Sequence, residues 1–265
     1  MRRAFRILAA LAFLTGLGWG QAHAQLTLTG AGCVVKCSSG GGGGSAPTLD
    51  GFAHNIGATV TLTTTKTNDV IVILASSENN AVTPTISSVS DTAGLTWARR
   101  GSKVTATSGS QQSSQEIWWA FSSGALSGDV ITVNFVGGAD LLALVAFGVN
   151  GSGSSSAPWD VNVSLPATAT SAVTGTPSVS GVSTTHANAI LLGFYSQGNT
   201  GAFTAQTSGS GFSIIDQTGS NAGSFSIAAA AESQGVTSAQ SSVSVAFGTS
   251  STAPWSIIAD AIAGP

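Results

Sequence analysis

Charged side chains are scarce in this sequence. Asp, Glu, Lys and Arg make up 7% of its 265 residues, whereas roughly 25% is usual for a soluble domain. Loss of Arg2, Arg3 and Arg6 with an N-terminal leader would take Lys and Arg from 8 to 5 against 11 acids, a net charge of −6. Binding to nucleic-acid phosphates needs clustered cations, so the sequence predicts no nucleic-acid partner. Hydroxyl and amide groups must provide solubility, which suits a secreted or surface-displayed β protein.

Cysteine is nearly absent as well. Cys33 and Cys37, in "CVVKC", are the two cysteines of the chain. In an exported protein the pattern favours a disulfide between them, and pairing with another chain is the alternative. Two cysteines without nearby histidines do not make a zinc site, and the "GGGGG" that follows lacks the strand and the lysine of a phosphate loop. The sequence therefore predicts no metal and no cofactor.

Long apolar runs are missing except near the start. Residues 1–24 combine three arginines, a short apolar run and the small-residue site Ala22-His23-Ala24, which is the pattern of a secretory signal peptide. The mature chain is then expected to begin at Gln25. A lipoprotein site at Cys33 is the weaker alternative, because Gly30 stands where a large aliphatic residue is expected. No membrane span is predicted elsewhere, and the expected location is extracellular or the cell surface, with the periplasm as an alternative.

The chain repeats itself, which divides it into parts. Residues 25–48 form a tethered segment with the cysteine pair and a flexible glycine-rich linker. After it, four segments recur in the same order about 112 to 120 residues apart. They are "NDVIVILASSENN" with "NAILLGFYSQGNT", "AGLTWARRGS" with "SGFSIIDQTGS", "VITVNF" with "VSVAF", and "ADLLALVAFGVNG" with "PWSIIADAIAG". The sequence predicts two repeat units, 49–151 and 172–265, joined by residues 152–171.

The segments within each unit are typical of strands. They are short, rich in Val, Ile, Thr and Phe, and separated by Gly, Ser, Asn and Pro. "DVIVILA" and "LLALVAFGV" are apolar on both faces and predict central strands, "VITVNF" alternates and predicts a half-exposed strand, and "AAAAES" is expected to be a strand like its counterpart "WWAFSS". We expect an all-β fold, an antiparallel β-sandwich or jelly roll built from two pseudo-repeats. The pattern leaves open whether the units share one sandwich, and it gives no oligomeric state.

Several of these segments resemble a family pattern. "SDTAGLTWARR", "EIWWAFSSGALSGDVITVNF", "LVAFGVNGSGSSSAPWD" and "THANAILLGFYSQG" are similar to a pattern that recurs in uncharacterised exported bacterial proteins and multidomain surface proteins. The resemblance covers most of residues 50 to 265. It implies a β-sandwich of surface or adhesive type and brings no catalytic residues with it.

The residues that an enzyme would need occur in patterns typical of turns. A glycosidase needs two carboxylates at a fixed separation, and most acids here stand beside Gly, Ser or Asn, which favours turn capping. The candidates are Glu78, Asp91, Glu116, Asp129, Asp140, Asp160 and Asp216. His54 and His186 lack a nucleophile-elbow pattern and are expected to lie in turns. No catalytic residue is predicted, and a secreted glycoside hydrolase ranks third among the functions considered.

The pair Trp118–Trp119 needs explaining, because neighbours in a strand point to opposite faces. The two strands of this hairpin are expected to pair around the loop "SKVTATSGSQQSS", residues 102–114. If Arg100 lies opposite Glu116, Trp119 faces the core and Trp118 shares the other face with Arg100 and Glu116. The core side would then comprise Leu95, Trp97, Ile117, Trp119 and Phe121. A shift by one residue would instead place Trp97 beside Trp118 and Arg99 against Glu116. The first register is favoured because one face becomes uniformly apolar, while Trp159 and Trp255, both in "APW", are expected to plug the sandwich ends.

Trp118 then separates two functions. Coverage of Trp118 by the other repeat fits a structural or adhesion module of the cell surface. Display of Trp118 beside Arg100 and Glu116 fits a carbohydrate-binding module, in which an indole stacks on a sugar and the charged groups bind hydroxyls. The expected partner is accordingly a cell-surface component or a polysaccharide.

Overall fold

Antiparallel strands account for all the regular structure that we describe. The computed structural model describes residues 44–79, 84–109, 111–138, 141–172, 175–199, 205–222, 225–249 and 253–265. These residues form fifteen strands and no helix, so within them no helix is available to cross a membrane. The predicted signal peptide, the predicted Cys33–Cys37 disulfide, Asp140 and the predicted glycine-rich linker up to residue 43 lie outside the described residues. The all-β, antiparallel part of the fold prediction is confirmed.

The strands are distributed evenly along the chain. Their bounds are β1 Thr48–Ile56, β2 Thr59–Leu62, β3 Asp69–Asn79, β4 Thr85–Asp91, β5 Ala98–Ser108, β6 Gln111–Ser122, β7 Asp129–Val136, β8 Leu141–Asn150, β9 Ala167–Ser171, β10 Ser178–Val182, β11 Ala189–Asn199, β12 Ser213–Ala222, β13 Phe225–Val236, β14 Val243–Ala246 and β15 Trp255–Ala263.

Two five-stranded sheets form the centre of the molecule. One has the order β1-β8-β3-β6-β5 and the other the order β9-β15-β11-β13-β12. The central strands β3 and β11 are buried on both faces because apolar side chains occupy successive positions, as the sequence predicts for β3 and β8. The alanine run of β13 is a strand, as expected, and its small side chains face apolar clusters on both sides.

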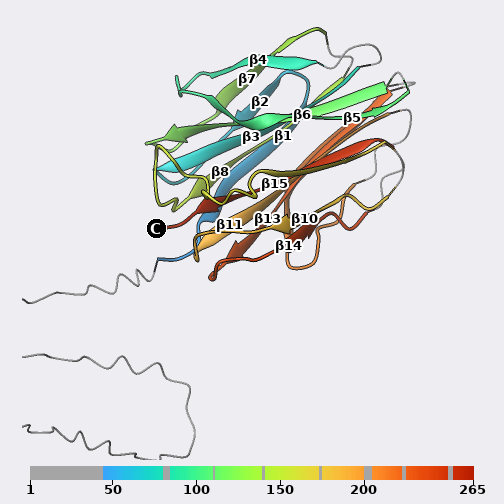
Figure 1. Cartoon of the computed structure of the whole chain (residues 1–265). Helices are drawn as coiled ribbons and strands as arrows, with labels where there is room; N and C mark the ends of the chain where they lie inside the picture. The colour runs from blue at the N-terminus through green and yellow to red at the C-terminus, as the bar shows by residue number, and fades with distance from the viewer. Residues whose placement is uncertain are drawn as a thin grey trace, which may run out of the picture. The chain divides into compact units, whose positions relative to one another are not determined.

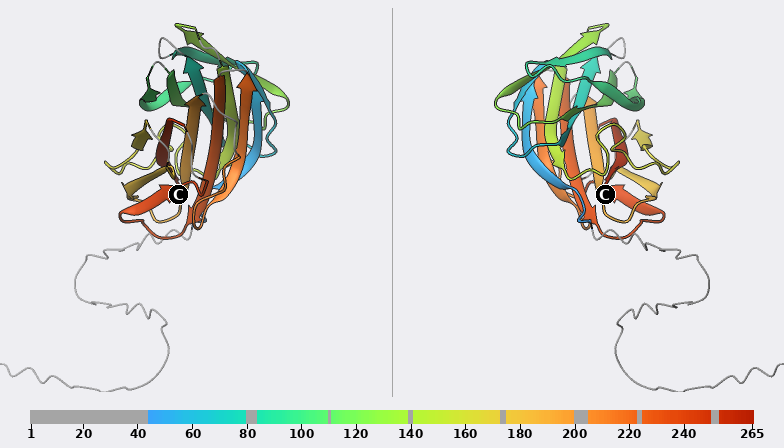
Figure 2. Two further views of the ribbon diagram at one scale, coloured as in Figure 1. Left: turned by 90° about the vertical axis from the view of Figure 1, so that its right-hand side faces the viewer. Right: turned by 90° about the vertical axis from the view of Figure 1, so that its left-hand side faces the viewer.

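Smaller sheets cover the outer faces of this pair. The three-stranded sheet β2-β7-β4 covers the first central sheet, and the two-stranded sheet β10-β14 covers the second. The result is a stack of four layers with three apolar clusters between them, visible as the succession of sheets in Figure 1 and edge-on in Figure 2. β7 alternates buried and exposed residues, as predicted from "VITVNF". The largest apolar cluster lies between the two central sheets, so both halves of the chain contribute to one core.

The two central sheets have the same strand order when each strand of the first half is matched with its counterpart in the second half. β1, β8, β3, β6 and β5 stand in the first sheet where β9, β15, β11, β13 and β12 stand in the second. The two sheets are stacked with their strand orders running in opposite directions. As a result, β1 lies against β12 and β5 lies against β9. At the centre, Ser76 of β3 and Ser196 of β11, each the eighth residue of its strand, form a buried hydrogen bond.

The hairpin that holds Trp118 differs from its prediction. The expected loop over residues 102–114 is wrong, because β5 continues to Ser108 and β6 begins at Gln111. Both registers considered for this hairpin are wrong as well: Arg100 lies opposite Ile117, Arg99 opposite Trp118 and Ala98 opposite Trp119. The physical reason is a bulge. Residues 101–103 loop out between Arg100 and Val104, with Gly101 at φ 70°, and this shifts the pairing.

Candidate functional site

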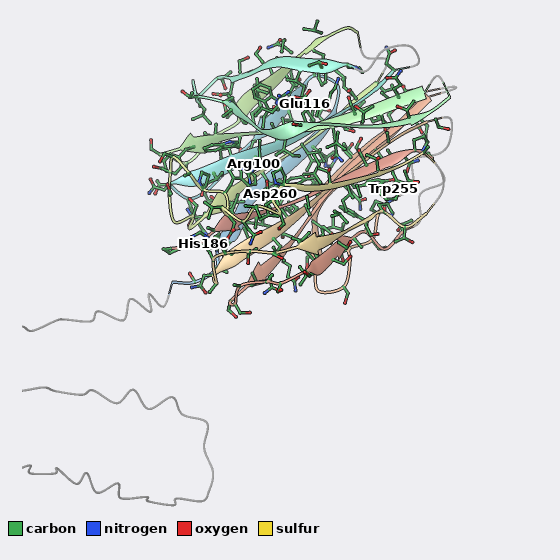
Figure 3. The ribbon with its side chains drawn as sticks, viewed as in Figure 1. Arg100, Glu116, His186, Trp255 and Asp260 are labelled. Atoms are coloured by element: carbon green, nitrogen blue, oxygen red, sulfur yellow. The ribbon has the colours of Figure 1, made fainter. Side chains whose placement is uncertain are left out.

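The structure separates the three residues of the predicted binding site. Glu116 and Trp118 face the three-stranded sheet, whereas Arg100 faces the second central sheet. The cause is the bulged register, which places Arg100 opposite Ile117 rather than Glu116. Figure 3 shows Arg100 next to Asp260, with Glu116 nearer to the three-stranded sheet. The expected grouping of Arg100 with Glu116 and Trp118 on one face is therefore wrong.

Trp118 is half-buried against the three-stranded sheet of its own half. It packs on the apolar cluster there together with Leu95 and Trp97, which were expected on the opposite face. Its Nε1 donates to Glu116 Oε2 at 3.3 Å. The structural interpretation expected the second half of the chain to cover Trp118. The residues that cover it belong to the first half instead.

Glu116 is a buried carboxylate with three donors. The backbone N–H of Ile86 donates to Oε1 at 3.0 Å, and Trp118 and Arg99 approach Oε2, the latter at 3.5 Å. Arg99, and not Arg100, is thus the arginine that pairs with Glu116. The donors come from β4, β5 and β6, so Glu116 ties the outer sheet to the central one.

Arg100 joins the two central sheets at their edge. Its Nε and Nη2 donate to the two carboxylate oxygens of Asp260 at 2.7 and 3.1 Å, a bidentate pair. The guanidinium also stacks on Trp159, 5.1 Å from the ring centroid, and Trp159 packs edge-to-face on Trp119. Burial raises the pKa of Asp260, although Arg100 opposes this effect. These contacts connect the two central sheets through one cluster, which consists of Arg100, Trp119, Trp159 and Asp260.

A groove opens beside this cluster. It has a volume of about 470 Å³ and runs between the bulged part of β5 and the edge strand β9. The lining residues are Gly101, Ser102, Lys103, Val104, Thr105, Pro166 and Thr168. A Cβ on Gly101 would lie 2.7 Å from Pro166 Cγ, so this approach of the two edges depends on glycine. We call the groove and its lining residues the β5–β9 groove.

The opposite edge of the same two sheets is closed. There His54 Nδ1 of β1 lies 2.9 Å from both carboxylate oxygens of Asp216 of β12. His54 is a strand residue, so its expected place in a turn is wrong, because β1 runs on to Ile56. His186 does lie in a loop, before β11. The two edges of one stack thus differ: the hydrogen-bonded His54 and Asp216 bridge one edge, and a groove lies at the other.

Two buried aspartates hold the loops that enter the central strands. Asp50 lies opposite Gly148, and the N–H of Asp160 donates to Ala261 O at 2.8 Å. Each carboxylate accepts consecutive backbone N–H groups: those of Thr65 and Lys66 for Asp50, and those of Thr185 and His186 for Asp160. Burial alone would raise the pKa of both aspartates, but these hydrogen bonds hold it below the usual value. Asp91 and Asp129 likewise accept N–H groups near chain turns.

Sequence reasoning missed Asp260 and Glu232. Asp260 stands in the apolar run "SIIADAIA" and Glu232 in "AAAAES"; an acid within such a run is the signal that could have identified them, because a lone buried charge requires a partner or a proton. Trp159 and Trp255 are buried, in keeping with the structural interpretation of "APW". No residue among those described belongs to a group of three or more His, Cys, Asp or Glu suited to a metal.

Comparisons with known proteins add no assignment to this geometry. No family model matches the chain, and neither the curated proteins nor the solved structures gave a match.

Proposed function

We propose that this protein is a secreted or cell-surface structural or adhesion module without catalytic activity, exported by the signal peptide of residues 1–24. The observation that carries the proposal is the stack of four layers around one core shared by both halves. The buried acids support it: Asp50 and Asp160 hold loops, Glu116 ties two layers together, and Asp260 joins the central sheets. A layered fold with these connections between its sheets is suited to resisting mechanical force at a surface.

The same proposal includes a duplication of one β unit. The matching strand order of the two central sheets supports it, as does the contact of Ser76 with Ser196 at their centre. The proposed units are those expected from the sequence, 49–151 and 172–265. Phe135 and Phe247, which end the matched segments "VITVNF" and "VSVAF" and were therefore expected at equivalent positions, pack on the outer clusters of the first and second halves respectively. The jelly-roll connectivity stays a prediction.

Carbohydrate binding is the second candidate, and one observation favours it. The β5–β9 groove presents the hydroxyl-bearing side chains of Ser102, Thr105 and Thr168 beside Pro166. Polar groups spaced along an open groove suit the hydroxyls of a saccharide. The proposed contact surface for this second candidate is the β5–β9 groove rather than the surface around Trp118.

An attachment assay tests the proposed function. Beads coated with residues 25–265 are mixed with insoluble polysaccharides and with isolated bacterial envelopes, and both bound beads and released reducing sugar are measured. We expect retention of the beads without sugar release. Release of sugar would support the hydrolase instead, and beads that attach to none of these surfaces would contradict an adhesive role.

A further inference from the structure

A nearly palindromic stretch of the sequence forms an open edge of the first central sheet. Residues 51–57 read "GFAHNIG", with His54 at the centre, a large apolar residue two positions away on each side and a glycine three positions away on each side. Gly51 and Gly57 have φ of 75° and 120°, so a glycine in the left-handed region bounds the segment 52–56 at each end. Among the described strands only β8 pairs with β1, and Figure 2 shows β1, in blue, at the margin of the molecule in both views.

The backbone of this segment presents hydrogen-bonding groups at the open side. The N–H of Gly57 donates to Leu142 O at 3.0 Å, and these two residues continue the register of Ile56 with Ala143. In an antiparallel pair, only alternate residues bond to the neighbouring strand. Residues 53, 55 and 57 therefore bond to β8, and residues 52, 54 and 56 turn their N–H and C=O groups outward.

The side chains of the same three outward residues are exposed. Phe52 is 59% exposed and Ile56 is 37% exposed, and they are two of the six exposed large apolar side chains among the described residues. His54 lies between them, and its Nδ1 is 2.9 Å from both carboxylate oxygens of Asp216 of β12. β1 contains no Lys, Arg or Pro that would keep another strand from pairing with it.

The other three edges of the central sheets carry features that keep a strand from pairing with another chain. β5 carries Arg100 and Lys103 and a three-residue bulge, and β9 has five residues and follows Pro166. β12 matches β5, with Asp216 in the place of Arg100, and a bulge at Ile215 interrupts its register. Charge, bulges, proline and short strands protect edges in natural sheets. The segment 52–56 of β1 lacks all of them.

We propose that two copies of this chain pair antiparallel through residues 52–56 of β1, about a two-fold axis at His54. The outward backbone groups of His54 bond to His54 of the second copy, and those of Phe52 bond to Ile56 of the second copy. The Phe52 and Ile56 side chains then cover each other on one face, and Gly51 lies opposite Gly57, where the strands separate.

The pairing joins the first central sheets of the two copies into one sheet, with five strands from each. Each His54 stays beside its own Asp216, whose carboxylate offsets repulsion between the two imidazoles when they are charged. The partner assigned to this edge is therefore a second copy of the chain, and the assignment goes beyond the attachment function proposed above.

Sedimentation velocity of the mature chain over a range of concentrations tests the pairing. We expect a mass of two copies that dissociates on dilution. Phe52→Lys and Ile56→Lys each place an ammonium group in the row, which should raise the dissociation constant of the dimer at least about tenfold. Val136→Lys and Val130→Lys are the matched controls, because these valines of β7 are 59% and 36% exposed and lie outside β1. Circular dichroism establishes that each variant is folded.

A single cysteine tests the register. With Cys33 and Cys37 replaced by Ser, His54→Cys places two thiols directly opposite each other in the dimer, within reach of a disulfide. We expect a covalent dimer after mild oxidation, measured on a non-reducing gel. Phe52→Cys is the matched control, because residue 52 faces residue 56 of the second copy and lies too far from its own counterpart to form a disulfide.

The outcomes separate this inference from the proposed function. A wild type that stays monomeric at every concentration would overturn the pairing, and so would a dimer that both β1 lysine variants leave intact or that the valine controls dissociate equally. A disulfide through residue 52 in place of residue 54 would overturn the register centred on His54. Monomeric protein that still attaches to a surface would leave the proposed function standing.

Discussion

Glu232 is the residue whose protonation links the fold to pH. It is fully buried on β13, opposite Gly193 of β11, whose missing side chain leaves room for the carboxyl group. The N–H of Gly209 donates to Oε2 at 2.8 Å, and Oε1 has no partner among the described residues. Burial raises the pKa of Glu232 to about 7, against the opposing hydrogen bond from Gly209.

The folded state therefore favours protonated Glu232. A raised carboxyl pKa gives stability that is complete below the unfolded value of 4.5 and is lost as pH rises to about 7. We expect the free energy of unfolding of the wild type, relative to Glu232→Gln, to fall by about 3 kcal/mol between pH 4 and pH 8. Urea denaturation at several pH values measures this difference. Parallel pH profiles for the two proteins would contradict it.

Other buried acids make comparison with the variant necessary. Burial also raises the pKa of Asp69 and of Asp260, so they change stability in the same direction as Glu232. Asp50 and Asp160 have lowered pKa values, and their contribution is lost only as pH falls below the usual aspartate range. Subtracting the profile of Glu232→Gln removes these shared terms, because the variant retains all four aspartates.

At the scale of the elements, β6 places its two tryptophans in different apolar clusters. Trp118 packs on the cluster beneath the three-stranded sheet, and Trp119 on the cluster between the central sheets. Both are half-buried, so truncation of either leaves a cavity. We expect Trp118→Ala and Trp119→Ala each to lower the free energy of unfolding by about 2–4 kcal/mol, measured by urea denaturation. Thr61→Ala, at an exposed position of β2, is the control. A change of less than about 1 kcal/mol for Trp118→Ala would mean that its indole is displayed rather than packed.

Local patterns predicted the strands better than they predicted contacts between them. Alternation in β7 and continuous apolar runs in β3 and β8 identified these strands, because side-chain burial within a strand follows from its own residues. The site depended on the register of β5 against β6, and Gly101 in the bulge of β5 packs against Pro166, far along the chain. The partner of Arg100 could not be predicted from local patterns either, because Asp260 is 160 residues away along the chain.

For the whole molecule, the shared core predicts cooperative unfolding. The cluster between the central sheets draws residues from both halves, and neither half retains cover for its inner face without the other. We expect one transition in urea, with far-UV circular dichroism and tryptophan fluorescence giving the same midpoint. Two separate transitions would mean that each half is stable alone. Disruption of the Arg100–Asp260 pair by Arg100→Met should lower that single midpoint without splitting the transition.

The contact of Ser76 with Ser196 has a consequence for how such a protein changes over time. If the proposed duplication holds, the ancestor was a pair of identical chains meeting about a two-fold axis, and each substitution then appeared on both sides at once. Fusion into one chain ended that constraint. A bulge of residues 101–103 could then arise in β5 without a counterpart in β12, and Arg100 could diverge from Asp216. One edge was thereby free to acquire a groove while the other continued to hold the sheets together.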